Sequence, residues 1–511
     1  MHKLPLFEKV GYATGDAAAN LVWRGALAYL AVFYTDTFGL TAAAAAMLFL
    51  VVRLTDGVTD IIMGMIADRT DTPWGKFRPW ILWSAPFLGL FMVLCFTTPD
   101  FSESGKLVYA YITYIGLTLA YTINNVPYSA LMGVMTTSDT ERTSLSGFRF
   151  AGAFAGGLLV MGFLPDLVAY FGAGDDAQGY QYSMYLFAGL LIALMVITFA
   201  TTTERIKVPV DTSSNLKAEL SDLLKNLPFI ILPLLAMTLF FYYRDIYSGS
   251  FFFVVMALMW IVIKRLINKP KENMTGTQRD MTDLITNKPW LILLGMGFLT
   301  MMYNGIKIGV VAYYFKYHVG DDLLTGKYFV ALLLVSILGA LCTSYFAKKL
   351  GKKNLFIWAL IISGLFTAAL YWVPQGNIVG IFTLGCISEF FAAMMPTLFF
   401  TMLGDSADYS EWKNGRRATG LIYSAGTFVQ KTGGGFAGAL VLVVLASYGY
   451  DGMDKATIEA SLPGMQLLMS WIPAAFAFAG AALMMTYPLS SQLNKQIGDE
   501  LIVRREPLAT S

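Results

Sequence analysis

Residues 41–66 read TAAAAAMLFLVVRLTDGVTDIIMGMI, an apolar run with a short charged segment in its second half. A helix needs about 20 mostly apolar residues to cross a bilayer, so this run is long enough to span a membrane. Similar runs recur from Ala17 to Pro488 with only short polar breaks. The sequence is 56% hydrophobic and 14% charged, whereas soluble domains carry about 25% charged residues. We therefore expect an all-α, polytopic membrane protein.

The apolar runs predict about 14 transmembrane helices. The predicted spans are 17–38, 41–66, 80–97, 107–134, 148–170 and 181–202, then 228–243 and 248–266, and finally 289–315, 325–347, 355–373, 378–403, 418–447 and 464–487. Two halves of similar helix number are common in secondary transporters, which are built from internal repeats. The chain therefore divides into an N-terminal six-helix half (1–211), an inserted two-helix hairpin and linker (212–275), a C-terminal six-helix half (276–490) and a cytoplasmic tail (491–511).

The inserted pair of helices has a counterpart later in the chain. Residues 222–228 read DLLKNLP and residues 283–289 read DLITNKP. A partial duplication of the entry to the second half would explain the similarity, and so would chance agreement between short apolar segments. We expect the inserted pair to lie beside a twelve-helix core.

The distribution of positive charge predicts the orientation, because loops rich in Lys and Arg stay in the cytoplasm. With a cytoplasmic N-terminus, most of the 36 Lys and Arg residues fall inside; those outside are Lys106, Arg244, Lys316, Lys327 and Lys455, and those within spans are Arg24, Arg53, Lys307 and Lys431. Both termini are then cytoplasmic. We expect no cleavable signal peptide, because the first apolar run is long and lacks a small-residue cleavage site.

Several classes of function are not expected. The net charge of +2 does not favour nucleic acid as a partner. Cys95, Cys342 and Cys386 lie in apolar runs without metal-ligand spacing, so they are predicted to fill the core. His2 is terminal and His318 lies at an outer helix end, so no nucleophile and base or metal cluster can be drawn. The chain is therefore not expected to be an enzyme.

Two aspartates in the run 41–66 predict a cation site. Asp56 and Asp60 are four residues apart and share a helix face, with Thr59 beside them and Arg53 one turn earlier. Ionisable groups inside a span cost about 2.5–3.5 kcal/mol each on insertion scales, so they usually mark a pathway. Two carboxylates suit a hard cation such as Na⁺. Alternatively, Arg53 and Asp56 form a structural ion pair and Asp60 completes a polar network.

The span 107–134 adds a second polar stripe. Its members are Thr122, Asn125 and Ser129, and Pro127 between them is expected to bend the helix. Thr122 is a further candidate oxygen ligand for the cation.

The first helix carries a set of side chains suited to a sugar. Asp16, Asn20, Trp23 and Arg24 share one face. Amides and charged groups bind sugar hydroxyls, and an indole covers the apolar face of a pyranose. The alternative is helix packing, with the Arg24 side chain paired or extended towards the interface.

Thr427 and Lys431 lie one turn apart in the span 418–447. A buried ammonium needs a carboxylate partner. We expect Lys431 to approach the aspartates of the cation site if the two halves face each other.

Charged residues at the cytoplasmic helix ends predict a gate. Asp68 and Arg69 follow the second span, and the lysine-rich loop 348–353 takes the equivalent place in the second half, as in the gate motif of the major facilitator superfamily. A further cytoplasmic cluster contains the acidic residues Asp405, Asp408 and Glu411 and the basic residues Lys413, Arg416 and Arg417. This cluster could pair across the halves with Arg142 and Arg149. Alternatively, the charges of the two loops only reflect the excess of Lys and Arg on the cytoplasmic side, and the residues of the cluster are only solvated by water.

Four segments together resemble the glycoside-pentoside-hexuronide cation symporter family, which includes the bacterial melibiose/sodium symporter. They are FYTD at 33–36, RLTDGVTD at 53–60, WGKFRPW at 74–80 and DSADYSE at 405–411. The resemblance covers both halves but not 212–275. It implies a major-facilitator fold in a bacterial inner membrane that imports a glycoside, pentoside or hexuronide with Na⁺, H⁺ or Li⁺ by alternating access.

The resemblance also implies roles for single residues. Asp56, Asp60 and Thr122 match the cation site, Lys431 matches a lysine that joins it, and Arg149 matches an arginine near the sugar. Asn20 and Asn125 stand where the melibiose carrier has two aspartates that hold the galactosyl hydroxyls, Ser129 replaces a tryptophan, and Thr59 replaces an asparagine. These departures put α-galactoside transport in doubt and leave the coupling cation open.

The sequence leaves open whether the sugar is acidic or neutral. A lysolipid or amphiphile carrier of the same fold is an alternative function. Arg24, with Lys307 as a second cation, favours an acidic sugar, because anions pair with guanidinium groups. If Glu389 or an aspartate of the second span neutralises Arg24, the sugar is neutral. The polar residues of the helices lie at the middle of the membrane, where an amphiphile carrier would need an apolar cleft, so they favour a sugar as the substrate.

Overall fold

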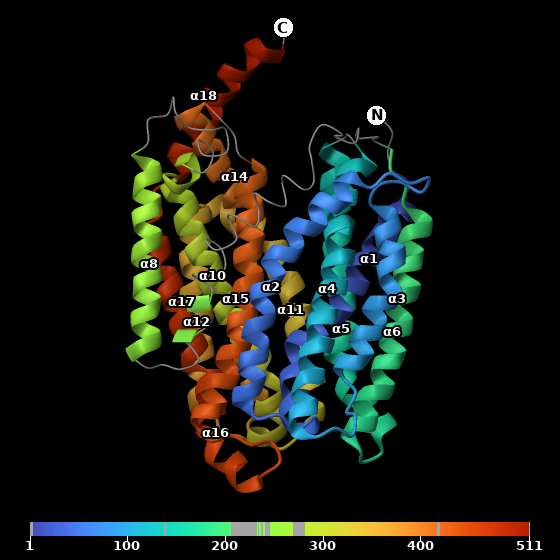
Figure 1. Cartoon of the computed structure of the whole chain (residues 1–511). Helices are drawn as coiled ribbons and strands as arrows, with labels where there is room; N and C mark the ends of the chain where they lie inside the picture. The colour runs from blue at the N-terminus through green and yellow to red at the C-terminus, as the bar shows by residue number, and fades with distance from the viewer. Residues whose placement is uncertain are drawn as a thin grey trace. The chain divides into compact units, whose positions relative to one another are not determined.

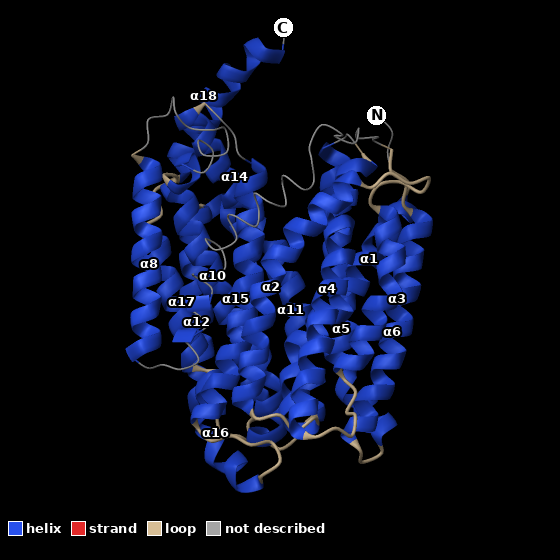
Figure 2. Ribbon diagram, viewed as in Figure 1, coloured by secondary structure: helices blue, strands red, loops and turns tan. Residues whose placement is uncertain are grey.

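The computed structural model describes residues 4–136, 139–205, 246–268, 282–415 and 419–509, together with residues 232, 235, 236, 239 and 240. The described residues form helices and loops, with no strand among them (Figure 2). They divide into two compact units. Unit 1 contains Met1–Ser248, Val311–Val330 and Leu442–Leu462, and unit 2 contains Gly249–Val310, Ala331–Val441 and Pro463–Ser511.

Most of unit 1 comes from the first part of the chain. Its helices are α1 (Leu6–Gly25), α2 (Ala42–Arg69), α3 (Arg78–Cys95), α4 (Glu103–Met135), α5 (Asp139–Gly172) and α6 (Asp176–Thr201), with the π-helical segments η1 (Ala26–Leu30), η2 (Phe33–Thr37) and η4 (Tyr314–Val319). Figure 1 shows α3 and α6 running side by side, and the two helices contact each other.

Unit 2 holds most of the later helices. They are α8 (Ile246–Ile267), α10 (Lys288–Tyr313), α11 (Leu323–Leu350), α12 (Lys352–Ala369), η5 (Leu370–Trp372), α13 (Ile378–Ala392), α14 (Met394–Asn414), α15 (Thr419–Ser447), α16 (Lys455–Met469), α17 (Trp471–Met485) and α18 (Ser491–Ala509). Some of these helices, such as α10 and α15, contribute their ends to unit 1. Within unit 2, α12 lies against α17.

The observed helices follow the apolar runs, with several differences. Helix α1 begins at Leu6, eleven residues before the predicted span, directly after Pro5, whose fixed φ suits a helix start. The predicted span 378–403 is divided into α13 and α14 at Ala393, and the span 464–487 is interrupted at Ser470, shortly before Pro473 in the first turn of α17. The predicted span 228–243 lies mostly outside the described residues.

Among the described residues, nine helical stretches are long and apolar enough to cross a membrane. The predicted total of about 14 is larger than this count. The predicted domain boundaries at 211–212 and 275–276 fall outside the described residues. The tail also contains a helix, α18, that the apolar pattern does not predict.

Helix α5 packs closely against α1 in unit 1. A Cβ atom at Gly152 would lie 2.1 Å from the main-chain oxygen of Ala13, and one at Gly156 would lie 2.1 Å from that of Ala17. Small residues four apart let two helix backbones approach in this way. The close approach places Arg149, one turn before Gly152, beside α1.

The end of α6 fixes the loop between α2 and α3. The Glu204 carboxylate accepts hydrogen bonds from the main-chain N–H groups of Lys76, Phe77 and Arg78, at 2.8, 2.8 and 2.9 Å. Gly75 has a φ of 111°, and a Cβ there would lie 2.6 Å from the Glu204 carboxylate. Glu204 therefore caps the N-terminus of α3, where the helix has unpaired N–H groups.

Candidate transport site

The predicted cation site lies between α2 and α4 of unit 1. The Thr122 hydroxyl donates a hydrogen bond of 2.9 Å to Oδ1 of Asp60. Thr122 is buried, and Asp60 and Thr59 are half-buried. The side chains of Arg53 and Asp56 lie outside the described residues, although their backbone belongs to α2. The structure thus brings together two of the four predicted cation-binding side chains.

Asp16 of α1 forms an ion pair with Arg149 of α5. The Arg149 Nε donates to Oδ2 of Asp16 at 3.1 Å, and the Asp16 side chain is 9% exposed. The Arg149 NH2 group donates to the Ser129 hydroxyl at 3.2 Å. This pair links helices α1, α4 and α5 through their polar faces.

The Asn20 amide extends the same chain of contacts along α1. Its Nδ2 donates to the main-chain oxygen of Asp16 at 2.9 Å, and its Oδ1 accepts a hydrogen bond from Arg24 Nε at 3.2 Å. The Arg24 guanidinium lies 5.5 Å from the centroid of the Phe154 ring. A Cβ at Gly157 would lie 2.3 Å from Arg24 Cδ, so the glycine makes room for this side chain.

Aromatic rings border these polar groups. Trp23 lies 5.7 Å from Tyr121 between ring centroids, and Tyr12 stacks on Tyr128 at 4.7 Å. The Arg149 guanidinium lies 5.4 Å from the Tyr128 ring. Asn125 is half-buried on α4.

Four of the contacting aromatic residues were not predicted from the sequence. They are Tyr12, Tyr121, Tyr128 and Phe154. Tyr12 is one turn from Asp16 on the polar face of α1, and this spacing is the signal that identifies it.

Unit 2 contains a buried polar network around Lys307. The Lys307 Nζ lies 3.3 Å from Glu389 Oε2, and the lysine side chain is 4% exposed. It also donates to the hydroxyls of Tyr303 and Ser388, at 3.2 and 3.1 Å. The Ser336 hydroxyl donates to the other Glu389 oxygen at 2.9 Å. Glu389 therefore neutralises Lys307, whereas one interpretation of the sequence assigned Glu389 to Arg24 and another used Lys307 to bind an anion.

The predicted substrate residues Thr427 and Lys431 lie on α15 in unit 2. Thr427 is exposed and Lys431 is half-buried. The approach of Lys431 to the aspartates of α2 stays a prediction.

The gate residues make different contacts from those expected. Lys352 Nζ donates to both oxygens of Asp405 at 2.7 Å, so this aspartate pairs within unit 2. Arg149 binds Asp16 within unit 1, and its expected pairing with the acidic cluster of the other half stays a prediction. Arg69 is half-buried and Asp408 lies on α14. The side chains of Asp68, Arg142 and Arg416 lie outside the described residues.

A second charged cluster in unit 1 surrounds Asp36, whose side chain is 2% exposed. Lys316 Nζ lies 3.2 Å from its Oδ2, and the hydroxyls of Tyr317 and Tyr450 donate to its carboxylate, the latter at 2.6 Å. The Thr35 hydroxyl donates to Oδ1 at 2.7 Å. The cluster joins η2, η4 and the segment after α15, and it was not predicted from the sequence.

Known proteins resemble this chain over nearly its whole length. The family model described as MFS/sugar transport protein matches residues 11–254 and 234–491. The inner membrane symporter YicJ of Escherichia coli (strain K12) is 32% identical over 92% of this chain and 89% of its own length. The putative glycoside/cation symporter YagG of the same organism is 31% identical over 99% and 96%, and the isoprimeverose transporter of Lactiplantibacillus pentosus is 29% identical over 98% and 92%.

Solved structures of transporters share the fold. A bacterial homologue of the human lysosomal transporter Spinster, in an inward-facing and unoccupied conformation, matches with a TM-score of 0.61, 14% identity, and coverage of 96% of this chain and 100% of that chain. The chain therefore belongs to the MFS/sugar transport protein family as a multi-pass membrane transporter of the glycoside-pentoside-hexuronide symporter type.

Proposed function

We propose that this protein imports a neutral glycoside together with a monovalent cation by alternating access. The single observation that carries the proposal is the Asp60–Thr122 hydrogen bond, which joins an intramembrane carboxylate and a hydroxyl from two different helices. Intramembrane ionisable groups usually mark ion or substrate pathways. The relatives named as symporters support the same activity.

The cation would be held by carboxylate and hydroxyl oxygens of α2 and α4. Asp60 and Thr122 supply two of these oxygens, and Asp56 and Thr59 are the proposed further ligands. Hard cations such as Na⁺ prefer oxygen donors. Protonation of Asp60 would serve H⁺ coupling with the same residue, so the ion is decided by experiment.

The sugar would be bound by the polar faces of α1, α4 and α5. Asn20, Asn125 and the Asp16–Arg149 pair offer donors and acceptors for hydroxyl groups, and the indole of Trp23 offers an apolar plate. Thr427 and Lys431 are the proposed contributions of α15. The sugar is proposed to be neutral because Lys307, the candidate second cation of the acidic interpretation, already has Glu389 as its counter-ion.

The proposed membrane orientation places both termini in the cytoplasm of a bacterial cell. Its support is the excess of Lys and Arg on one set of loops. A relative is described as an inner membrane symporter, which supports the same membrane.

Uptake into proteoliposomes tests the proposal. Neutral glycosides and uronides would be supplied outside, with an inward Na⁺ gradient or an inward H⁺ gradient. We expect uphill accumulation of a neutral glycoside with one gradient and its loss in Asp60→Asn, while Asp499→Asn, an exposed aspartate of α18, transports normally. Uphill accumulation by Asp60→Asn would refute the cation site, and absence of any sugar uptake under both gradients would refute sugar symport.

A further inference from the structure

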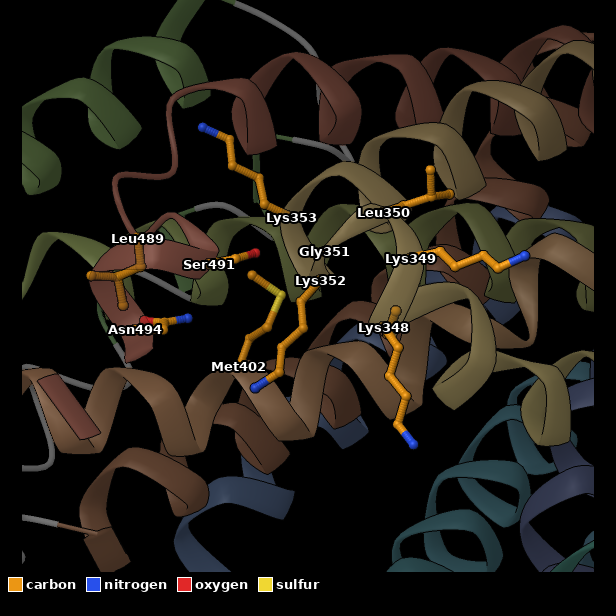
Figure 3. A pocket seen from close by; sticks show the side chains of 11 residues that line it. Lys348, Lys349, Leu350, Gly351, Lys352, Lys353, Met402, Leu489, Ser491 and Asn494 are labelled. Carbon is orange, nitrogen blue, oxygen red and sulfur yellow. The ribbon is translucent and has the colours of Figure 1, made fainter. Parts of the chain in front are cut away.

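The turn between α11 and α12 carries four lysines around a cavity. The cavity has a volume of about 420 Å³, which lies in the range of small-molecule sites, about 300–1,000 Å³. Its polar lining residues are Lys348, Lys349, Lys352, Lys353, Ser491 and Asn494. Figure 3 shows the amines of Lys348 and Lys349 on one side of Gly351 and those of Lys352 and Lys353 on the other. We refer to this cavity as the basic pocket.

Hydrogen bonds within unit 2 hold together the elements around the basic pocket. Lys352 binds both oxygens of Asp405 at 2.7 Å, and Asn494 Nδ2 donates to the same carboxylate at 3.2 Å. Gly351 has a φ of 78°, and a Cβ there would lie 2.6 Å from the Ser491 hydroxyl. The turn, α14 and α18 are therefore fixed against one another, and Asp405 neutralises Lys352.

The other three lysines keep their charge available to a ligand. Lys353 Nζ donates to the main-chain oxygens of Met485 and Tyr487, at 2.9 and 2.6 Å, and these carbonyls do not neutralise it. Lys348 and Lys349 are exposed, and Lys349 Nζ lies 4.6 Å from the centroid of the Tyr345 ring. Among the described residues, Lys348 has no ion-pair or hydrogen-bond partner. The pocket thus presents a net positive charge.

The first turn of α12 adds to this positive potential. Gly351 is the N-cap of this helix and makes no side-chain cap hydrogen bond. The N–H groups at a helix N-terminus favour an anion. The helix end therefore adds to the positive potential of the lysines around the turn.

An apolar surface borders the basic pocket. Leu338, Leu341 and Tyr345 lie three or four residues apart on α11, so they share a face, and they are 57%, 73% and 57% exposed. Leu350, which lines the pocket, is 44% exposed. Lys348 and Lys349 follow the apolar residues of α11, and Lys352 and Lys353 open α12, so the lysines lie at the boundary between hydrocarbon and water.

We propose that the basic pocket binds the phosphate head group of an anionic phospholipid, such as phosphatidylglycerol or cardiolipin. Basic pockets between transmembrane helices on the cytoplasmic side recognise such head groups. The exposed strip of Leu338, Leu341 and Tyr345 would contact the acyl chains, which a soluble phosphate lacks. The inference does not depend on sugar symport, because it concerns a surface outside the proposed transport site.

Native mass spectrometry of the purified, delipidated full chain tests this site. Dioleoyl phosphatidylglycerol, cardiolipin and dioleoyl phosphatidylethanolamine would each be added to the wild type, to the double variant Lys348→Gln/Lys349→Gln and to the control Lys288→Gln/Lys495→Gln. The control removes two exposed lysines of unit 2 that do not line the pocket. We expect the anionic lipids to bind about tenfold more tightly than phosphatidylethanolamine, and the pocket variant to lose this preference while the control keeps it.

Three results would overturn the proposal. They are equal loss of lipid in the two double variants, equal binding of anionic and zwitterionic lipids by the wild type, and displacement of the lipid by millimolar inorganic phosphate, which would identify a site for a soluble anion. If thermal unfolding shows that the double variant is misfolded, the single variants Lys348→Gln and Lys349→Gln replace it, because both side chains are exposed.

Discussion

The hydroxyl of Tyr450 donates a 2.6 Å hydrogen bond to the carboxylate of Asp36, although the two residues are 414 positions apart in the sequence. Lys316 and Tyr317 bind the same carboxylate. Burial and the charge of Asp36 raise the pKa of Tyr450, so its phenol keeps its proton and donates at neutral pH. Under the proposed orientation this cluster holds the extracellular ends of three segments together.

The first prediction is that Tyr450→Phe favours a state open to the outside. A hydrogen bond to a charged group is worth about 1.5–3 kcal/mol, so its loss should shift the population about tenfold or more. Distances between spin labels at Gln178→Cys and Glu459→Cys, in a background without the three native cysteines, would report the shift. Tyr448→Phe is the matched control; an unchanged distance distribution in Tyr450→Phe would show that the cluster does not hold this face closed.

The second prediction concerns the contact between α1 and α5. Gly156→Ala should destabilise the protein strongly, because its Cβ would lie 2.1 Å from a main-chain oxygen that cannot move without shifting α1. We expect a loss of about 1–3 kcal/mol or more, with reduced sugar binding, since Asp16 and Arg149 depend on the contact. Gly147→Ala is the control on the same helix, because no atom lies within 4 Å of its Cβ position. Thermal unfolding in detergent measures both, and equal melting temperatures would contradict the tight contact.

Apolar run length predicts most of the helices, because a membrane span is defined by its own residues. It misses the start of α1, since Glu8 and Asp16 interrupt the apolar pattern there. Both charges are compensated by distant residues: Glu8 pairs with Arg205 at 2.7 Å and Asp16 pairs with Arg149 at 3.1 Å. A sequence pattern reports the face of one helix and not which distant helix meets it.

The candidate site shows the same limit. The spacing of residues in the sequence places Asp56 and Asp60 on one face of α2 and makes Thr122 a candidate cation ligand. It does not show that the Thr122 hydroxyl bonds to Asp60. It identifies Lys307 and Glu389 as buried charges, but only the tertiary structure shows that they pair with each other. The Asp36 cluster has no signal in local spacing, because its partners come from three separate parts of the chain.

The third prediction is that the Lys307–Glu389 pair contributes to folding rather than to anion binding. Glu389→Gln leaves a buried ammonium without its carboxylate, and breaking a buried pair costs about 3–5 kcal/mol. Lys307→Met/Glu389→Gln should recover much of this loss, because it removes the uncompensated charge. A thermal-unfolding cycle of the two single variants and the double variant measures the coupling, and additive effects would show that the pair is not coupled.

The fourth prediction is that Glu204→Ala loosens the loop before α3. It removes the acceptor of three main-chain N–H groups, and loss of a helix cap costs about 0.5–2 kcal/mol. Hydrogen exchange at Lys76–Arg78 should become faster, while exchange at the start of α6, which Asp175 caps, stays unchanged. Unaltered exchange at Lys76–Arg78 would show that Glu204 is not the effective cap.

The last prediction decides whether the sugar is neutral or acidic. The Arg24 side chain bonds to Asn20 at 3.2 Å and lies against Phe154 and Gly157, which is the setting of a group that orients its neighbours. Lys307 has Glu389 as its partner and is therefore not available as a second cation for a carboxylate. We therefore expect Arg24→Gln to weaken binding of a neutral glycoside and of its uronide counterpart by similar factors of up to about tenfold, through the lost support of Asn20.

Competition binding with matched glycoside and uronide pairs measures these factors, and Arg24→Lys separates charge from shape. If the arginine binds a carboxylate in a bidentate manner, its replacement by glutamine should reduce uronide affinity by far more than that of the neutral glycoside, and lysine should restore only part of it, because an ammonium cannot form the paired hydrogen bonds. That selective loss would establish an acidic sugar and refute the neutral assignment. Equal losses in the two ligands, with Lys behaving like Gln, would instead show that Arg24 acts through Asn20.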